Sequence, residues 1–127
     1  MARKRSRKNI VKSLDDLTRR IVLKRDEGVC QWCGKSVTGR DAQCSHVRSR
    51  KYYETRWALS NVKLLCASCH FKWHDNPLEA GKWFDKTFPA RAEWILEQKR
   101  QSPKTWRDPD LLELESELKQ KLKEIDE

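Results

Sequence analysis

The three histidines of the chain are the residues whose types and spacing point most directly to chemistry. His70 and His74 are four residues apart, so a helix would place both imidazoles on one face, one turn apart, where they can bind a divalent metal ion. His46 lies upstream, and Asn61 lies between it and the pair. The pattern indicates a site for metal-assisted hydrolysis.

The cysteines predict a second, structural metal site. Cys30 and Cys33 form one CxxC pair, followed by a glycine that permits a tight turn, and Cys66 and Cys69 form another. Two such pairs can close a tetrahedral site of four thiolates around zinc, the alternative being unpaired buried cysteines. Bound zinc would contribute folding free energy on the order of 10 kcal/mol. Cys44 is left over, and we expect it to be buried or close to the zinc.

Composition and charge restrict the class of protein. A chain of 127 residues with 37% apolar and 37% charged residues has room for one small domain with a thin core. The odd cysteine count, the CxxC spacing and the lack of a secretory signal favour a reduced, intracellular compartment, and no apolar run reaches membrane length. Residues 108–127 carry eight acids against three lysines, a net charge of −5. The total net charge is +9, so residues 1–107 carry +14. Nucleic acid is the favoured partner of so basic a domain, ahead of an anionic membrane.

The elements that position these residues can be outlined from capping and periodicity. Residues 1–12 hold six basic residues and no acid, and we expect a disordered arm that follows phosphates or serves as a solubilising tail. Ser13 predicts a helix start, as do Pro77 and Pro89 further along, within a domain spanning residues 13–100. Residues 101–127 form a linker and an acidic amphipathic helix, which either docks on its own domain or makes a homodimer through residues 110–126. Its apolar stripe comprises Leu111, Leu114, Leu118, Leu122 and Ile125.

The order of these motifs resembles that of the HNH, or ββα-metal, endonucleases. The resemblance rests on His46, Asn61 and His70, on the flanking CxxC pairs and on a fourth residue at His74. The wider pattern of CxxCGK, QCSH, TRW, CxxCH and NP is similar to the phage NinG/Rap type of recombination nuclease. The resemblance implies an α+β fold: a small zinc-stabilised ββα module with flanking helices, its hairpin at about residues 42–65 and its helix from about residue 67.

The resemblance also implies roles for individual residues. His46 would be the general base, because imidazole suits proton transfer near neutral pH, and Asn61 would hold the loop that carries it. His70 and His74 would bind a catalytic divalent ion, Mg²⁺ or Mn²⁺. Ser45 stands where many HNH enzymes place a metal ligand, and a neutral hydroxyl is a poor substitute. From the residues alone, His46 and Asn61 could instead be turn residues, and His70 could be a spare zinc ligand.

The function expected from these features is hydrolysis of DNA by an HNH endonuclease. Phage or prophage recombination on branched or single-stranded DNA, in the cytoplasm of a bacterial host, is the setting that the resemblance implies. A noncatalytic zinc-stabilised DNA-binding module is the alternative, and an RNA-binding or RNA-cleaving protein is a third. Basic residues around the site are expected to contact DNA phosphates rather than form a merely solvated face: Arg48, Arg50, Lys51, Arg56, Lys63 and Lys72.

Overall fold

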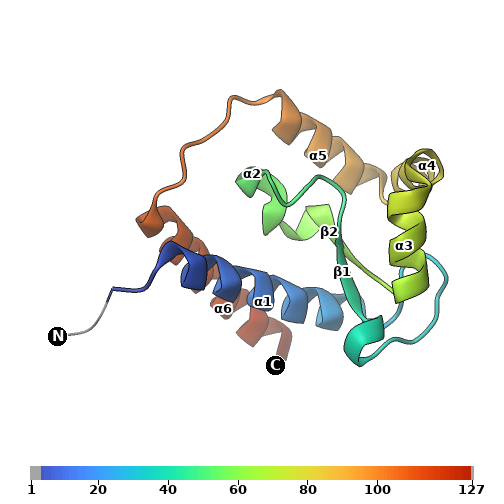
Figure 1. Ribbon diagram of the computed structural model, residues 1–127, viewed down its shortest axis with the longest axis horizontal. Coiled ribbons are helices and arrows are strands. Elements are labelled where there is room, and N and C mark those ends of the chain that lie inside the picture. The colour runs from blue at the N-terminus through green and yellow to red at the C-terminus, as the bar shows by residue number, and fades with distance from the viewer. Residues whose placement is uncertain (1–3, 127) are drawn as a thin grey trace.

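The structure is a computed structural model that describes residues 4–126, and it is built from helices around one small sheet (Figure 1). The elements in chain order are α1 (Arg7–Arg25), η1 (Gly39–Asp41), β1 (Gln43–His46), α2 (Tyr53–Arg56), η2 (Leu59–Asn61), β2 (Val62–Leu65), α3 (Ala67–Asp75), α4 (Pro77–Thr87), α5 (Pro89–Arg100) and α6 (Asp108–Asp126). No helix in this part of the chain is long and apolar enough to span a membrane.

The expected ββα unit is present. Strands β1 and β2 pair antiparallel, with Ser45 opposite Lys63 and His46 opposite Val62, and α3 follows β2 directly. Paired residues project to the same face of a sheet and successive residues to opposite faces. The register therefore puts Ser45 and Lys63 on one face of the hairpin and His46 on the other. The α+β class and the ββα arrangement predicted from the sequence are confirmed.

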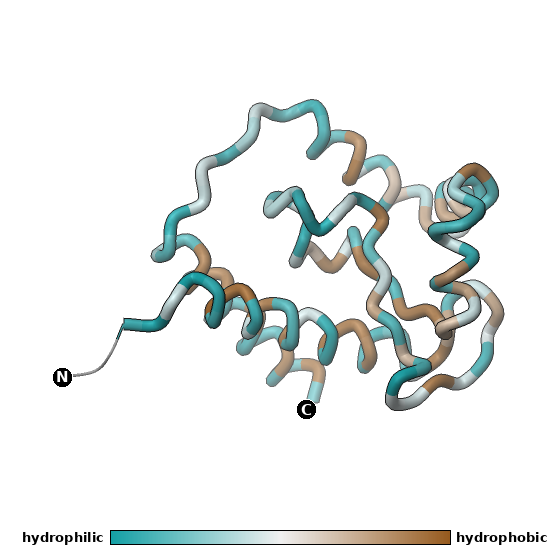
Figure 2. Tube along the Cα trace, viewed as in Figure 1, coloured by the Kyte–Doolittle hydropathy of each residue, from teal (hydrophilic) through white to brown (hydrophobic). Residues whose placement is uncertain are grey.

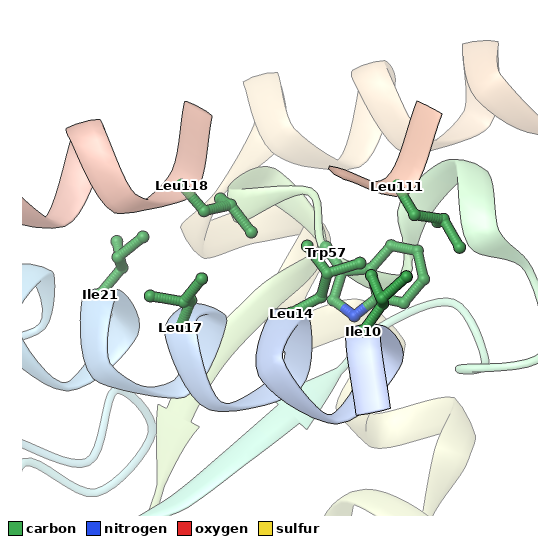
Figure 3. Close-up of a cluster of buried hydrophobic side chains, with 7 residues drawn as sticks. All are labelled: Ile10, Leu14, Leu17, Ile21, Trp57, Leu111 and Leu118. Carbon is green, nitrogen blue, oxygen red and sulfur yellow. The ribbon is translucent and has the colours of Figure 1, made fainter. Parts of the chain in front are cut away.

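One apolar cluster joins the first helix, α1, to the C-terminal helix α6. Side chains from α1 and α6 meet along their length with Trp57 between them, as Figure 3 shows. Apolar and polar residues alternate along both helices, so that each presents one apolar side to the other (Figure 2). The helices run parallel, since Arg7 pairs with Asp108 at their first turns and Lys24 pairs with Asp126 at their last. Seven residues form the buried centre: Ile10, Leu14, Leu17, Ile21, Trp57, Leu111 and Leu118.

This packing decides between the two alternatives for the C-terminal stripe. Leu111 and Leu118 are buried against α1, so α6 docks on its own domain. The apolar stripe that would join two copies is thus used within the chain. A homodimer through residues 110–126 would require α6 to leave α1.

The N-terminal segment differs from the sequence prediction. Helix α1 begins at Arg7, and its N-cap is Ser6, whose side chain accepts a hydrogen bond from the Asn9 amide, rather than Ser13. Residues 7–12 are thus helical, not part of a disordered arm. The physical reason is the acidic face of α6: Glu115 and Asp108 pair with Arg5 and Arg7 and remove the self-repulsion of the basic run. Residues 1–3 of the expected arm lie outside the described residues.

A buried ion pair holds the sheet against the end of α1. Arg25 makes a bidentate pair with Asp26 and also donates to the carbonyls of Leu59 and Val62, at 2.6 and 2.7 Å. Asp26 in turn accepts from the Leu64 amide at 2.9 Å. Backbone groups at the start of β2 are thereby satisfied by one arginine and one aspartate, which fixes the strand that precedes α3.

Candidate functional site

Four cysteines come together in the geometry that zinc requires. The Sγ atoms of Cys30, Cys33, Cys66 and Cys69 lie within 4.8 Å of one another, and those of Cys33 and Cys66 are 3.8 Å apart. A tetrahedron with Zn–S bonds of about 2.3 Å places its sulfurs about 3.8 Å apart. The cluster is compatible with structural zinc, as the sequence predicts.

Backbone amides donate hydrogen bonds to two sulfurs of this cluster. The amides of Cys33 and Cys69 donate to the sulfurs of Cys30 and Cys66, at 3.5 and 3.3 Å. Burial alone would raise the pKa of Cys30, but amide hydrogen bonds outweigh it and lower that pKa to about 7. Gly34, with φ of 81°, provides the left-handed turn after the first pair. Cys66 is also the N-cap of α3, so this centre determines where that helix begins.

His46 ends β1 with its ring held by the backbone. Its Nε2 lies 2.9 Å from the carbonyl oxygen of Arg56. Because a carbonyl only accepts, Nε2 carries the proton of the neutral ring and Nδ1 retains its free lone pair. Burial, together with the charge of Arg50, lowers the pKa of His46 to about 4, despite the opposing effect of the Arg56 carbonyl. The imidazole is therefore neutral at physiological pH and able to accept a proton.

Asn61 is fully buried and ties together the two ends of the segment between the strands. Its Oδ1 accepts from the Arg48 amide at 2.8 Å. Its Nδ2 donates to the carbonyls of Arg48 and Thr55, at 3.1 and 3.0 Å. The Asn61 carbonyl also accepts from the Val47 amide at 2.8 Å. The side chain thus fixes the residues that follow His46 and those just before the carbonyl that holds its ring.

His70 and His74 face each other on α3. Their Nε2 atoms are 3.1 Å apart. Two metal–nitrogen bonds of about 2.1 Å at a right angle would separate the nitrogens by about 3.0 Å. Burial, with smaller effects from His74 and Lys63, lowers the pKa of His70 and favours the neutral ring that a metal ion needs. The pair therefore fits two adjacent ligand positions of one divalent ion.

All three histidines line one open cleft of about 800 Å³ between the end of β1 and the helices α3 and α4. Arg50 also lines this cleft, from the loop after β1, and so does Asp85 from α4. The sequence reading missed Asp85. It follows Phe84, one of the two buried residues of α4, and the apolar face of that helix could have indicated its position.

Ser45 and Lys63 occupy the other face of the hairpin. Both side chains are fully buried, and Nζ of Lys63 donates to Ser45 Oγ at 2.8 Å. Lys63 Nζ also lies 3.2 Å from the centre of the Trp73 ring. The assignment of Lys63 to DNA binding is therefore wrong, because both faces of β2 are covered. Ser45 likewise does not line the cleft, so it cannot be a third protein ligand for an ion held by His70 and His74.

The other basic residues divide by their contacts. Arg56 is engaged with Asp15, at 2.7 and 3.1 Å, and little of it is exposed. Arg48 stacks on Tyr52, 4.0 Å from the ring centre. Two of its guanidinium nitrogens are buried without a hydrogen-bond partner in the described part of the chain. The remaining three residues are more open to phosphate: Arg50, Lys51 and Lys72.

Asp15 is a second residue that sequence reasoning missed. It lies in the middle of α1, where it accepts from Arg56 and also from the Trp57 indole at 2.7 Å. These hydrogen bonds outweigh burial and lower the pKa of the Asp15 carboxyl. Asp15 thus fixes Arg56, whose carbonyl orients His46. Its partners are distant in sequence, so no local signal identifies it.

A comparison with known families agrees with this geometry. The family model described as HNH endonuclease matches residues 30–76, which span both CxxC pairs, the hairpin and α3. The match covers a little over a third of the chain and supports the HNH family for this segment. Neither the search of curated proteins nor that of solved structures found a match.

Proposed function

We propose that the protein is a metal-dependent endonuclease of the HNH type that hydrolyses phosphodiester bonds in DNA. One observation carries the proposal: His46, His70 and His74 line one cleft, and the ring of His46 is oriented by a backbone carbonyl. The net charge of +9 favours a polyanionic substrate. The four-cysteine centre sets the start of α3, and with it the positions of the two histidines on that helix.

In this proposal His46 is the general base. Nδ1 takes a proton from the attacking water, while Nε2 stays hydrogen-bonded to the Arg56 carbonyl. A pKa of about 4 makes a weak base, but the negative charge of a bound phosphodiester raises it toward neutrality. Asn61 is a positioning residue that holds the loop, and a carboxamide does so without competing for the proton.

His70 and His74 hold the catalytic ion, Mg²⁺ or Mn²⁺. A divalent ion held by His70 and His74 would supply electrostatic stabilisation of the negative charge that develops on the phosphate and on the leaving 3′ oxygen. The ligand set contains two imidazole nitrogens and no contribution from Ser45, and nitrogen ligands favour Mn²⁺ over Mg²⁺. Arg50, Lys51 and Lys72 position the phosphates around the cleft.

Phage or prophage recombination is the proposed setting, in the cytoplasm of a bacterial host. The wider motif pattern shared with the NinG/Rap type supports it, and branched or single-stranded DNA is the corresponding substrate. A short hairpin and helix read little of the base sequence, so selectivity for DNA structure is expected rather than for sequence. The expected products carry a 5′ phosphate and a 3′ hydroxyl.

The test is cleavage of plasmid, single-stranded and branched DNA by the zinc-loaded protein, with Mg²⁺, with Mn²⁺ or with neither ion added. Cleavage should require a divalent ion, should be greater with Mn²⁺, and should be lost in His46→Ala. Lys121→Ala is a control outside the cleft, because it removes an exposed lysine of α6 and leaves the three histidines intact. Cleavage by His46→Ala at the parental rate would refute the assignment of the base.

The alternative function is a zinc-stabilised module that binds DNA without cutting it. Burial of Ser45 favours it, because the ion then has only two identified protein ligands. If neither the parent nor His46→Ala cuts any of these substrates while both bind them, the noncatalytic module is the better description.

A further inference from the structure

Two bulky apolar side chains stand out on the rim of the histidine cleft. Phe71 is 71% exposed and Leu78 is 76% exposed, whereas the other exposed large apolar residues reach at most 44%. Neither belongs to an apolar cluster of the described chain. The two side chains contribute nothing to the packing of the domain, and exposed apolar side chains of this size are typical of a binding surface.

Both residues flank positions that line the cleft. Phe71 follows His70 on α3 and lies about 60° around the helix from His74, and both histidines line the cleft. Leu78 follows Pro77, which lines the cleft at the start of α4. Lys72 and Glu79, the next residue after each, form an ion pair at 3.0 Å. This ion pair brings together the two helical turns that carry Phe71 and Leu78.

The charges beside this rim indicate what it contacts. Leu78, Lys82 and Lys86 are spaced by four residues and form one stripe along α4, and both lysines are exposed. Neither lysine has an ion-pair partner within residues 4–126. Arg50 stands on the other wall of the cleft. An apolar rim that continues into a row of cations complements a strand of nucleic acid with unstacked bases, which presents flat apolar surfaces beside regularly spaced phosphates.

We propose that Phe71 and Leu78 contact an unpaired base of single-stranded or branched DNA at the cleft, with Phe71 stacking on the base and Lys82 and Lys86 following the adjoining phosphates. The inference rests on the proposed function for the identity of the cleft, and it names the residues that select unpaired DNA there. In a fully paired duplex the bases are already stacked on one another, so contact with Phe71 and Leu78 adds little to the affinity for duplex DNA.

Binding without cleavage provides the test. Zinc-loaded His46→Ala protein, with no Mg²⁺ or Mn²⁺ added, is titrated into a fluorescein-labelled single strand and into the corresponding duplex, and affinities are read by anisotropy. Adding Phe71→Ala should weaken single-strand binding about tenfold and duplex binding less than twofold, because stacking contributes per unpaired base. Phe71→Trp should restore the preference. A 2-aminopurine at a fork junction should lose fluorescence on binding with Phe71 and not with alanine.

Controls separate this inference from other causes. Leu96→Ala, which removes a residue 44% exposed on α5, should leave both affinities unchanged. Equal zinc content and equal melting temperature establish that each variant is folded. The inference is overturned if Phe71→Ala and Leu78→Ala leave the affinity for the single strand unchanged, or if they weaken single-strand and duplex binding by the same factor. In the first case a protein partner is the better explanation of the two exposed side chains. Loss of cleavage by the parent with the binding preference intact would overturn only the proposed nuclease.

Discussion

Lys63 provides a quantitative test of the structure, because a lysine buried without a carboxylate should destabilise the fold in a pH-dependent way. It is fully buried between Ser45 and Trp73, and burial lowers its pKa from the usual 10.5 to about 6. The folded protein therefore prefers the neutral amine, while the unfolded chain carries the ammonium up to about pH 10.5. Between these two values the unfolded state binds more protons, so the free energy of unfolding rises with pH, by about 1.4 kcal/mol per unit.

The perturbation that reveals this effect is the double variant Lys63→Met, Ser45→Ala. Removing both partners avoids leaving a buried hydroxyl unpaired, which would cost about 1–3 kcal/mol. We expect the variant to be more stable than the parent, by at most about 5 kcal/mol at pH 7 and about 3 kcal/mol at pH 8.5. The gain should shrink toward zero near pH 10.5, where the unfolded lysine also becomes neutral.

Urea unfolding at pH 6.5, 7.5 and 8.5, at one fixed free zinc concentration, measures the difference directly. The pH dependence of zinc binding by the thiolates is common to both proteins and cancels. Lys51→Met, which removes an exposed lysine, should follow the parent at every pH. If the parent and the double variant gain stability in parallel across this range, Lys63 has an ordinary pKa and the reasoning fails.

Three further predictions concern the catalytic base, its support and the core. Cleavage should persist in mild acid and fall as the pH drops through the folded pKa of His46, about 4, because the ring must be neutral to accept a proton. The measurement is kcat/KM between pH 4 and 8. A midpoint near 6.5 would show that burial does not lower the pKa of this histidine. Asn61→Ala should lose about 2–4 kcal/mol of stability in urea unfolding, because three backbone groups around the loop lose their hydrogen bonds to the side chain. It should also lower kcat more than it raises KM. Leu118→Ala should lower the free energy of unfolding in urea by about 2–5 kcal/mol, because the side chain is only 5% exposed between α1 and α6. Leu112 is 42% exposed on the same helix, so Leu112→Ala should lower it by less than about 0.5 kcal/mol. Equal losses from the two leucines would show that α6 does not dock as described.

Local chemistry made much of the fold predictable. Four cysteines in two CxxC pairs have few ways to satisfy zinc, so their cluster followed from spacing alone. Pro77 and Pro89 mark the first residues of α4 and α5, because proline fits the first helical turn. The antiparallel hairpin and the helix after it followed from the family resemblance, and the three histidines lie in one cleft.

Long-range partners account for what the sequence did not reveal. The start of α1 depends on acids of α6 some hundred residues away, so a basic run that should repel itself is helical instead. Asp15 likewise finds Arg56 and Trp57 about forty residues downstream. The burial of Lys63 did carry a local signal, since Val62, Leu64 and Leu65 surround it with an apolar strand. A strand covered on both faces should have argued against an exposed lysine there.

The parallel pairing of α1 with α6 also has a consequence for synthesis. The apolar side of α1 remains uncovered until α6 has been synthesised, because its main partners lie in that helix. The zinc module, by contrast, has all its ligands by Cys69 and can close earlier. The nascent chain therefore passes through an interval in which all four zinc ligands are present while the basic helix α1 still lacks its partner α6.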